Sequence, residues 1–166
     1  MSQSQQFSST YFKVEDRLLL RGRFPDDTEV QLLLTRRLTR GLLEMVDRLS
    51  GTLVSKRVSD PAKMKIVAEF AREAAVENAD YSKAYSAGRP HPLMKNGPRL
   101  VTSLSLAPQE NGYIAVIVRF GKRDQINFLI AAHGLWSLSH LIAKQAKAAE
   151  WDLSTTEKTV AISRIN

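Results

Sequence analysis

The strongest constraint on this fold is a hydrophobic pattern that occurs twice, 96 residues apart. The segment RFPDDTEVQLLLTRRLTRGLLEMV, from Arg23, aligns without a gap with RFGKRDQINFLIAAHGLWSLSHLI, from Arg119. In both copies alternating apolar residues flank a short polar turn, which predicts a β-hairpin, and apolar residues at helical spacing then predict a helix. The agreement in hairpin length and helix onset favours an internal duplication. Chance convergence of two ordinary hairpin–helix units stays open as the alternative.

Each half is expected to hold three strands followed by a helix. We expect strands at 11–14, 17–24, 29–34, 100–106, 113–120 and 125–130, and helices at 36–50 and 132–149. Asp60 is a good N-cap and Pro61 suits a first helical turn, so a further Ala-rich helix is expected from there to Ala87. The predicted fold class is α+β, with two strand–strand–strand–helix units joined by this long helix. Helices are expected to pack on one face of antiparallel sheets.

The length of 166 residues suits one domain with a sizeable core. We expect a single α+β domain over 11–153, with half-repeats at about 11–50 and 99–149 and a connecting helix at about 60–87. Residues 1–10 are polar and are expected to form a disordered tail. Residues 154–166 are expected to form a C-terminal tail, either docked or serving as a last strand.

The order of elements over about 11–50 and 99–149 resembles that of the Whirly and Pur-type single-stranded nucleic-acid-binding proteins. Those families repeat antiparallel strands followed by a helix and bind nucleic acid through sheet surfaces. None of their signature motifs occurs here, and the long inserted helix departs from a simple repeat. The resemblance therefore implies a class of function, nucleic-acid binding at a sheet surface, and no particular site residues.

The balance of charge favours an anionic partner. Lys and Arg number 24 against 17 Asp and Glu, a formal net charge of +7, which raises affinity for polyanions without identifying one. Cysteine is absent, which excludes disulfides, thiol catalysis and thiolate metal sites. A cytoplasmic location is expected, since no secretory signal is visible. The most apolar stretch, 127–143, is too short and too polar to span a membrane.

Basic and aromatic side chains alternate with apolar ones along both predicted hairpins. The residues expected on the outward faces are Arg17, Arg21, Arg23, Tyr113 and Arg119. Arginine contacts phosphate and stacks on bases, and tyrosine offers a stacking platform, so these faces are candidates for binding nucleic acid. The alternative is a solvated sheet face on which Glu29 neutralises an arginine across the hairpin.

A second basic cluster stands at the predicted start of the first helix. Arg36, Arg37 and Arg40 place positive charge where the helix dipole is already positive. An anion bound at this N-terminus would offset that repulsion, so the cluster is a candidate anion site. Salt bridges to the protein's own carboxylates are the alternative.

Catalytic and metal-binding signals are missing. The three histidines, His91, His133 and His140, do not form a metal-binding spacing with a third ligand. No Gly-rich phosphate loop, nucleophile elbow or HExxH motif occurs. We therefore expect no catalytic residue, no metal and no cofactor, and a protein that is not an enzyme.

These observations predict a non-enzymatic module that binds a polyanion. The favoured ligand is single-stranded DNA or RNA, bound by Arg17, Arg21, Arg23, Arg36, Arg37, Arg40, Tyr113 and Arg119. The alternative function is an assembly or adaptor protein whose basic surface docks an acidic protein. No membrane partner is expected, and homo-oligomerisation stays open.

Overall fold

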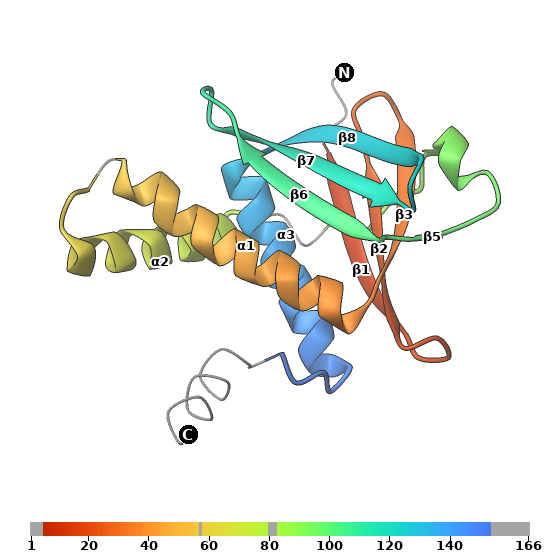
Figure 1. Ribbon diagram of the computed structural model, residues 1–166, viewed down its shortest axis with the longest axis horizontal. Coiled ribbons are helices and arrows are strands. Elements are labelled where there is room, and N and C mark those ends of the chain that lie inside the picture. The colour runs from red at the N-terminus through yellow and green to blue at the C-terminus, as the bar shows by residue number, and fades with distance from the viewer. Residues whose placement is uncertain (1–4, 57, 80–82, 154–166) are drawn as a thin grey trace.

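Two sheets and three α-helices make up the chain in the computed structural model, which describes residues 5–56, 58–79 and 83–153 (Figure 1). The first sheet, called sheet A here, contains β1 (Gln6–Phe12), β2 (Arg17–Arg23) and β3 (Thr28–Leu34), paired antiparallel. Two short strands, β4 (Arg89–Pro90) and β5 (Arg99–Leu100), pair with β3 in parallel. The second sheet, sheet B, is an antiparallel meander of β6 (Ser103–Pro108), β7 (Tyr113–Phe120) and β8 (Asp124–Ala131).

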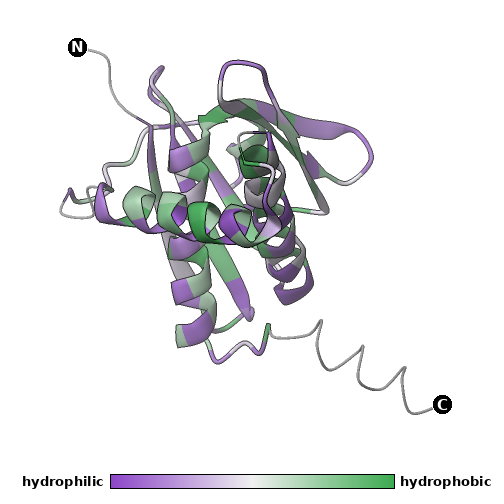
Figure 2. Ribbon diagram, turned by 90° about the vertical axis from the view of Figure 1, so that its left-hand side faces the viewer, coloured by the Kyte–Doolittle hydropathy of each residue, from purple (hydrophilic) through white to green (hydrophobic). Residues whose placement is uncertain are grey.

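The helices are exchanged between the sheets. The helix that follows sheet B, α3 (Ala132–Ala148), packs on β1 and β2 of sheet A. The helix that follows sheet A, α1 (Arg36–Ser55), packs against β6 of sheet B. The third helix, α2 (Pro61–Glu77), packs on α1 and α3. Hydrophobic and hydrophilic patches alternate along the helix ribbons, as expected of helices with one buried face (Figure 2).

A single core lies between the sheets and the helices. Its most deeply buried aliphatic side chains come from both sheets and from α3, among them Leu18, Leu34, Ile114, Ile130 and Ile142. Since residues of both halves contribute to one cluster, neither half encloses a core of its own. The mixed α+β class expected from the sequence is therefore confirmed.

The two hairpins agree in register with the 96-residue offset. Leu18 pairs with Leu34 in the first hairpin, and Ile114 pairs with Ile130 in the second. Both helices also begin directly after the last strand, with N-caps at positions 35 and 131. The first strands do not follow the offset, because Gln6 pairs with Arg23 whereas Ser103 pairs with Arg119. The duplication itself stays a prediction.

Several boundaries differ from the sequence expectations. The strand expected at 11–14 lies at Gln6–Phe12, so the polar tail expected over 1–10 is wrong for its second half. The first helix, expected over 36–50, continues to Ser55. The Ala-rich helix begins at Pro61 with Asp60 as N-cap, as predicted, but ends at Glu77 rather than at Ala87.

The segment 89–100 contains the two short strands that pair with β3 and, between them, a 3-10 helix, η1 (Pro92–Met94). The C-terminal tail expected at 154–166 lies outside the described residues. Within the residues that are described, no helix combines the length and the apolar character that crossing a membrane requires.

The register of β8 predicts opposite effects for two adjacent residues. Ile130 is 1% exposed in the core, whereas Leu129 is 53% exposed on the other face of the strand. We expect Ile130→Ala to lower the free energy of unfolding by about 2–5 kcal/mol through loss of burial and a cavity. Leu129→Ala should change it by less than about 0.5 kcal/mol. Urea unfolding of both variants checks this, and the reverse order would indicate a register shifted by one residue.

Candidate nucleic-acid interface

The three arginines predicted on the first hairpin lie on the outer face of sheet A, but the protein's own chain engages them. Arg21 forms an ion pair with Glu29, with 3.4 Å between Nη2 and Oε2, and stacks over the ring of Tyr85 at 4.6 Å. Arg23 donates from Nη1 to the carbonyl oxygen of Ser86 at 3.2 Å. Arg17 donates to the carbonyl oxygen of its neighbour, Asp16. The expected row of open arginines is therefore only partly available to a ligand.

Glu29 is the centre of this arrangement, because its carboxylate is buried on the outer face of the sheet. The residue is only 2% exposed. It accepts hydrogen bonds from the Tyr85 hydroxyl at 2.9 Å and from the Gly88 backbone N–H at 3.0 Å, as well as from the Gln31 side chain. A buried carboxylate needs such donors to remain ionised. The stretch 85–88 therefore closes over this end of sheet A.

The protonation states follow from the same contacts. Burial raises the pKa of Glu29, but hydrogen bonds from Gln31, Gly88 and Tyr85 outweigh it, so the pKa is lowered overall. Burial and the hydrogen bond to Glu29 raise the pKa of Tyr85 far above its ordinary value. The carboxylate thus stays charged and the phenol stays a donor near neutral pH. For Arg21, the alternative in which Glu29 neutralises an arginine across the hairpin describes the structure well.

The arginines at the start of α1 do not converge on one empty site. Thr35 caps the helix by accepting a hydrogen bond from the Leu38 N–H. Arg36 forms an ion pair with Asp16, at 2.9 Å, and Arg40 donates to the carbonyl oxygen of Asp152 at 3.2 Å. Arg37 is exposed and makes no ion pair with a residue that the structure describes.

Asp16 connects the start of α1 to β1 and to the segment that follows α3. Its carboxylate accepts from the Trp151 indole N–H and from the Tyr11 hydroxyl, each at 2.8 Å, besides Arg36. Its backbone has φ of 50°, a left-handed conformation that Asp and Asn tolerate better than most residues. The hydrogen bonds from Trp151 and Tyr11 and the contact with Arg36 hold the pKa of Asp16 below its usual range.

The outer face of sheet B is more open. We use this name for the residues that alternate with the core residues of β6, β7 and β8. They are Ser103, Ser105, Ala107, Tyr113, Ala115, Ile117, Arg119, Gln125, Asn127 and Leu129. This set contains no carboxylate, and Tyr113, Gln125, Asn127 and Leu129 are exposed.

Arg119 and Tyr113, both predicted site residues, lie at opposite ends of β7 on this face. Six residues of extended chain separate them by about 20 Å. Arg119 donates from Nη1 to the Ser105 hydroxyl at 3.4 Å and stands in one row with Gln125 across the strand pair. It forms no ion pair with any carboxylate of the described chain. Its charge is therefore available at the surface.

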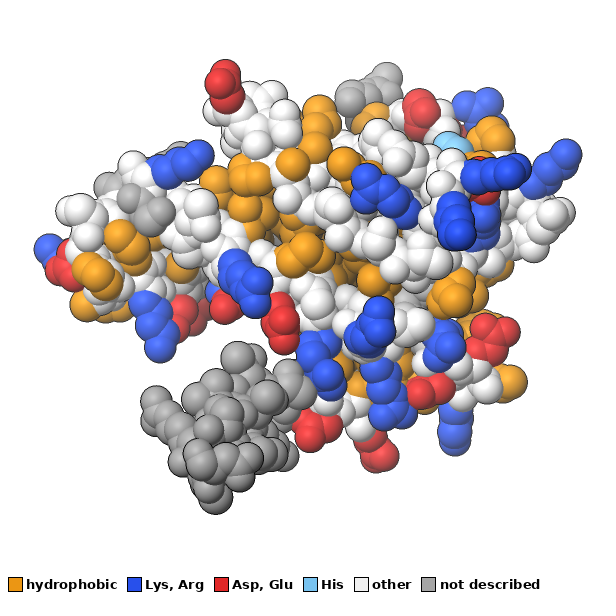
Figure 3. Space-filling model, viewed as in Figure 1, with side chains coloured by type: hydrophobic (Ala, Val, Ile, Leu, Met, Phe, Trp, Pro, Cys, Tyr) orange, Lys and Arg blue, Asp and Glu red, His pale blue; other side chains and the backbone are white. Residues whose placement is uncertain are grey.

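A basic turn lies beside Arg119. Lys122 and Arg123 are exposed in the turn between β7 and β8. Figure 3 shows Lys and Arg side chains gathered at the end of the molecule where this turn and η1 lie. Arg99, on β5, is tied down by Asp124 at 2.8 Å and stacks over Phe120 at 4.9 Å. From the sequence, Lys122 and Arg123 were predicted only to lie in the turn of the second hairpin. Their two adjacent positive charges are the signal that would have added them to the candidate site.

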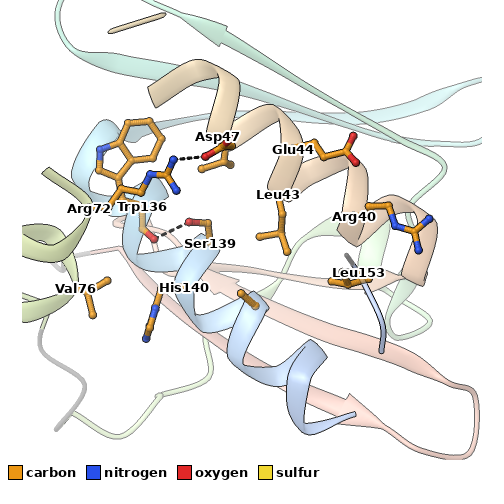
Figure 4. A pocket seen from close by; sticks show the side chains of 12 residues that line it. Arg40, Leu43, Glu44, Asp47, Arg72, Val76, Trp136, Ser139, His140 and Leu153 are labelled. Atoms are coloured by element: carbon orange, nitrogen blue, oxygen red, sulfur yellow. Dashed lines mark hydrogen bonds and ion pairs between the residues drawn. The ribbon is translucent and has the colours of Figure 1, made fainter. Parts of the chain in front are cut away.

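The cavity between α1, α2 and α3 offers little chemistry. It has a volume of about 420 Å³ and is lined by both polar and apolar side chains (Figure 4). Arg72 pairs with Asp47 at its edge. The Ser139 hydroxyl donates to the carbonyl oxygen of Trp136 at 2.7 Å instead of to His140. In the residues that the structure describes, no group of three or more His, Asp or Glu side chains could hold a metal ion.

Comparison with protein-family models, curated proteins and solved structures found no match to this chain. The candidate interface consequently depends on geometry and charge alone. Of the predicted site residues, the structure leaves Tyr113 and Arg119 together on one open face. Arg37 stands alone on α1, and the other five arginines contact the protein's own chain.

The lowered pKa of Asp16 predicts a pH-dependent contribution to stability. Ionised Asp16 stabilises the folded state above the unfolded-state pKa, about 3.9, and this stabilisation is lost as the pH falls through the lower folded-state pKa. Asp16→Asn keeps an acceptor for Trp151 but does not titrate. We expect its urea midpoint to be below that of the wild type at pH 7, and the difference to narrow as the pH is lowered to about 2.5.

The control for this measurement is Glu15→Gln, which removes a neighbouring exposed carboxylate. It should leave the urea midpoint nearly unchanged at both pH values, since surface substitutions without such contacts have small effects. A constant difference between Asp16→Asn and the wild type at the two pH values would contradict the assigned role of the Asp16 charge.

Proposed function

We propose that the protein binds single-stranded nucleic acid, without catalysis, along the outer face of sheet B. The observation that carries the proposal is an exposed antiparallel face with an available arginine and no carboxylate. A sheet face of this kind suits a flexible polyanion, because no negative charge on it opposes the phosphates. The resemblance in element order to Whirly and Pur-type proteins is consistent with this class of function.

Each kind of side chain on the outer face of sheet B would make a different contact with nucleic acid. Arg119 would contact phosphate, supported from the adjoining turn by Lys122 and Arg123. Tyr113 and Leu129 would offer apolar surface to unstacked bases. The amides of Gln125 and Asn127 can donate to and accept from base edges. With one aromatic ring on the face, stacking is sparse, so charge would provide most of the affinity.

Sheet A is the less favourable surface. Its arginines are engaged by Glu29, by the 85–88 stretch and by Asp16, and freeing them would expose a buried carboxylate or break an existing contact. We therefore propose that Arg17, Arg21 and Arg23 mainly stabilise the fold and do not bind the nucleic acid. We also propose a cytoplasmic location and an origin by internal duplication.

Salt dependence of binding tests the proposal. With fluorescently labelled oligo(dT) and a mixed-sequence oligonucleotide, contacts to about four phosphates predict a slope of log affinity against log salt near −2.8. Arg119→Gln should weaken binding of both oligonucleotides and make the slope shallower by about 0.7. Tyr113→Ala should weaken binding by about 1–3 kcal/mol and leave the slope unchanged.

The matched control is Arg37→Gln, which removes the same charge from an exposed position on α1. It should preserve the affinity and the slope. Equal losses for Arg37→Gln and Arg119→Gln would point to non-specific attraction by net charge and contradict a site on sheet B. Absence of oligonucleotide binding at low salt would overturn the proposal and favour the rival function, docking of an acidic protein.

A further inference from the structure

The outer side of α2 carries a stripe of side chains that the described part of the chain leaves uncovered. The helix buries only Ala68 and Ala75 against the rest of the described structure. On the opposite side Ile66 and Phe70 are 53% and 66% exposed. Counted along the helix, the stripe reads Lys63, Ile66, Phe70, Glu73 and Glu77. Its spacing alternates between three and four residues, which is the pattern of a helix that pairs with another helix.

The charges on α2 are arranged against its own dipole. Lys63 and Lys65 stand near the N-terminal end, and Glu73 and Glu77 stand near the C-terminal end. Helices are stabilised by the reverse order, with acidic residues first and basic residues last. All four side chains are exposed, and none forms an ion pair with a described residue. These four charges are therefore unfavourably placed relative to the helix dipole, and no ion pair with a described residue offsets them.

We infer that α2 pairs antiparallel with α2 of a second copy of this chain. The two-fold axis of such an antiparallel pair would cross the exposed side of α2 at the level of Ala68 along the helix. Ile66 then meets Phe70 of the partner subunit, and Lys63 meets Glu73 of the partner subunit. Two-fold symmetry repeats both contacts, so one stripe supplies two apolar layers flanked by two ion pairs. Each positive helix N-terminus then lies beside the partner subunit's negative charges, which relieves the unfavourable arrangement.

A second copy fits this stripe better than an acidic or a basic partner. The exposed surface of α2 carries charges of both signs in nearly equal number, although the whole chain carries +7. A strongly charged partner would be attracted to one end of the helix and repelled from the other. A helix with the same charge order, running in the opposite direction, matches both ends, and α2 of a second copy has that order. This inference is independent of nucleic-acid binding, which uses sheet B.

Charge reversal tests the geometry of the pair. Sedimentation equilibrium should give about twice the 18.6 kDa chain mass for the wild type. In a dimer of the Lys63→Glu variant, both interface ion pairs become contacts between two glutamates. In a dimer of the Glu73→Lys variant, both become contacts between two lysines. Each variant alone should therefore dimerise with a Kd raised about tenfold or more. An equimolar mixture of the two variants should regain wild-type dimerisation, because every opposed pair in the mixed dimer is again of opposite sign.

The apolar layers have a separate test. Phe70→Ser should raise the dimer Kd on the order of tenfold or more. The control Phe12→Ser removes another exposed aromatic ring, on β1, and should leave the Kd unchanged. A wild-type protein that is monomeric at high concentration would overturn the inference. So would a dimer that Phe70→Ser does not weaken, or a charge-reversed pair that fails to recover on mixing.

Discussion

The apolar inner faces of two sheets have to be buried, and each is packed against by a helix that follows the other sheet. α3 lies on sheet A, although it follows sheet B, and α1 lies against β6 of sheet B, although it follows sheet A. The exchange brings Leu18 and Ile114 from different halves into one core with Ile142 of α3. A half of the chain by itself would leave its sheet uncovered, so we expect the two halves to fold as one cooperative unit.

This use of the inner faces leaves the outer faces of the sheets for a ligand, and the difference between them that matters most is a carboxylate. Sheet A carries a buried carboxylate, Glu29, which requires donors and recruits Arg21, Tyr85 and the Gly88 N–H. Once those donors are in place, the 85–88 stretch lies over that end of the sheet. Sheet B has no equivalent carboxylate on its outer face. Arg119 consequently keeps its charge available at the surface, whereas Arg21 does not.

The sequence alone could predict what depends on local pattern. Alternation and turn chemistry predicted both hairpins, and Asp60 with Pro61 predicted the start of α2. The first half of the N-terminal strand was not predicted, because Ser9, buried between Phe7 and Tyr11, interrupts the expected apolar alternation. The roles of Arg23 and Arg36 could not be predicted, because Ser86 and Asp16 reach them only through the fold. Sequence spacing carries no information about such long-range partners.

The outer face of sheet B and the exposed stripe of α2 would act together in binding a long strand. A single face on sheet B with one available arginine and one aromatic ring can provide only modest affinity for a polyanion. A two-fold dimer through α2 would carry two such faces on one particle. Binding of one face to a long strand would then raise the effective concentration of the other face near the same strand. Overall affinity for long single strands would exceed that of either face without any additional contact, provided that the strand spans both faces.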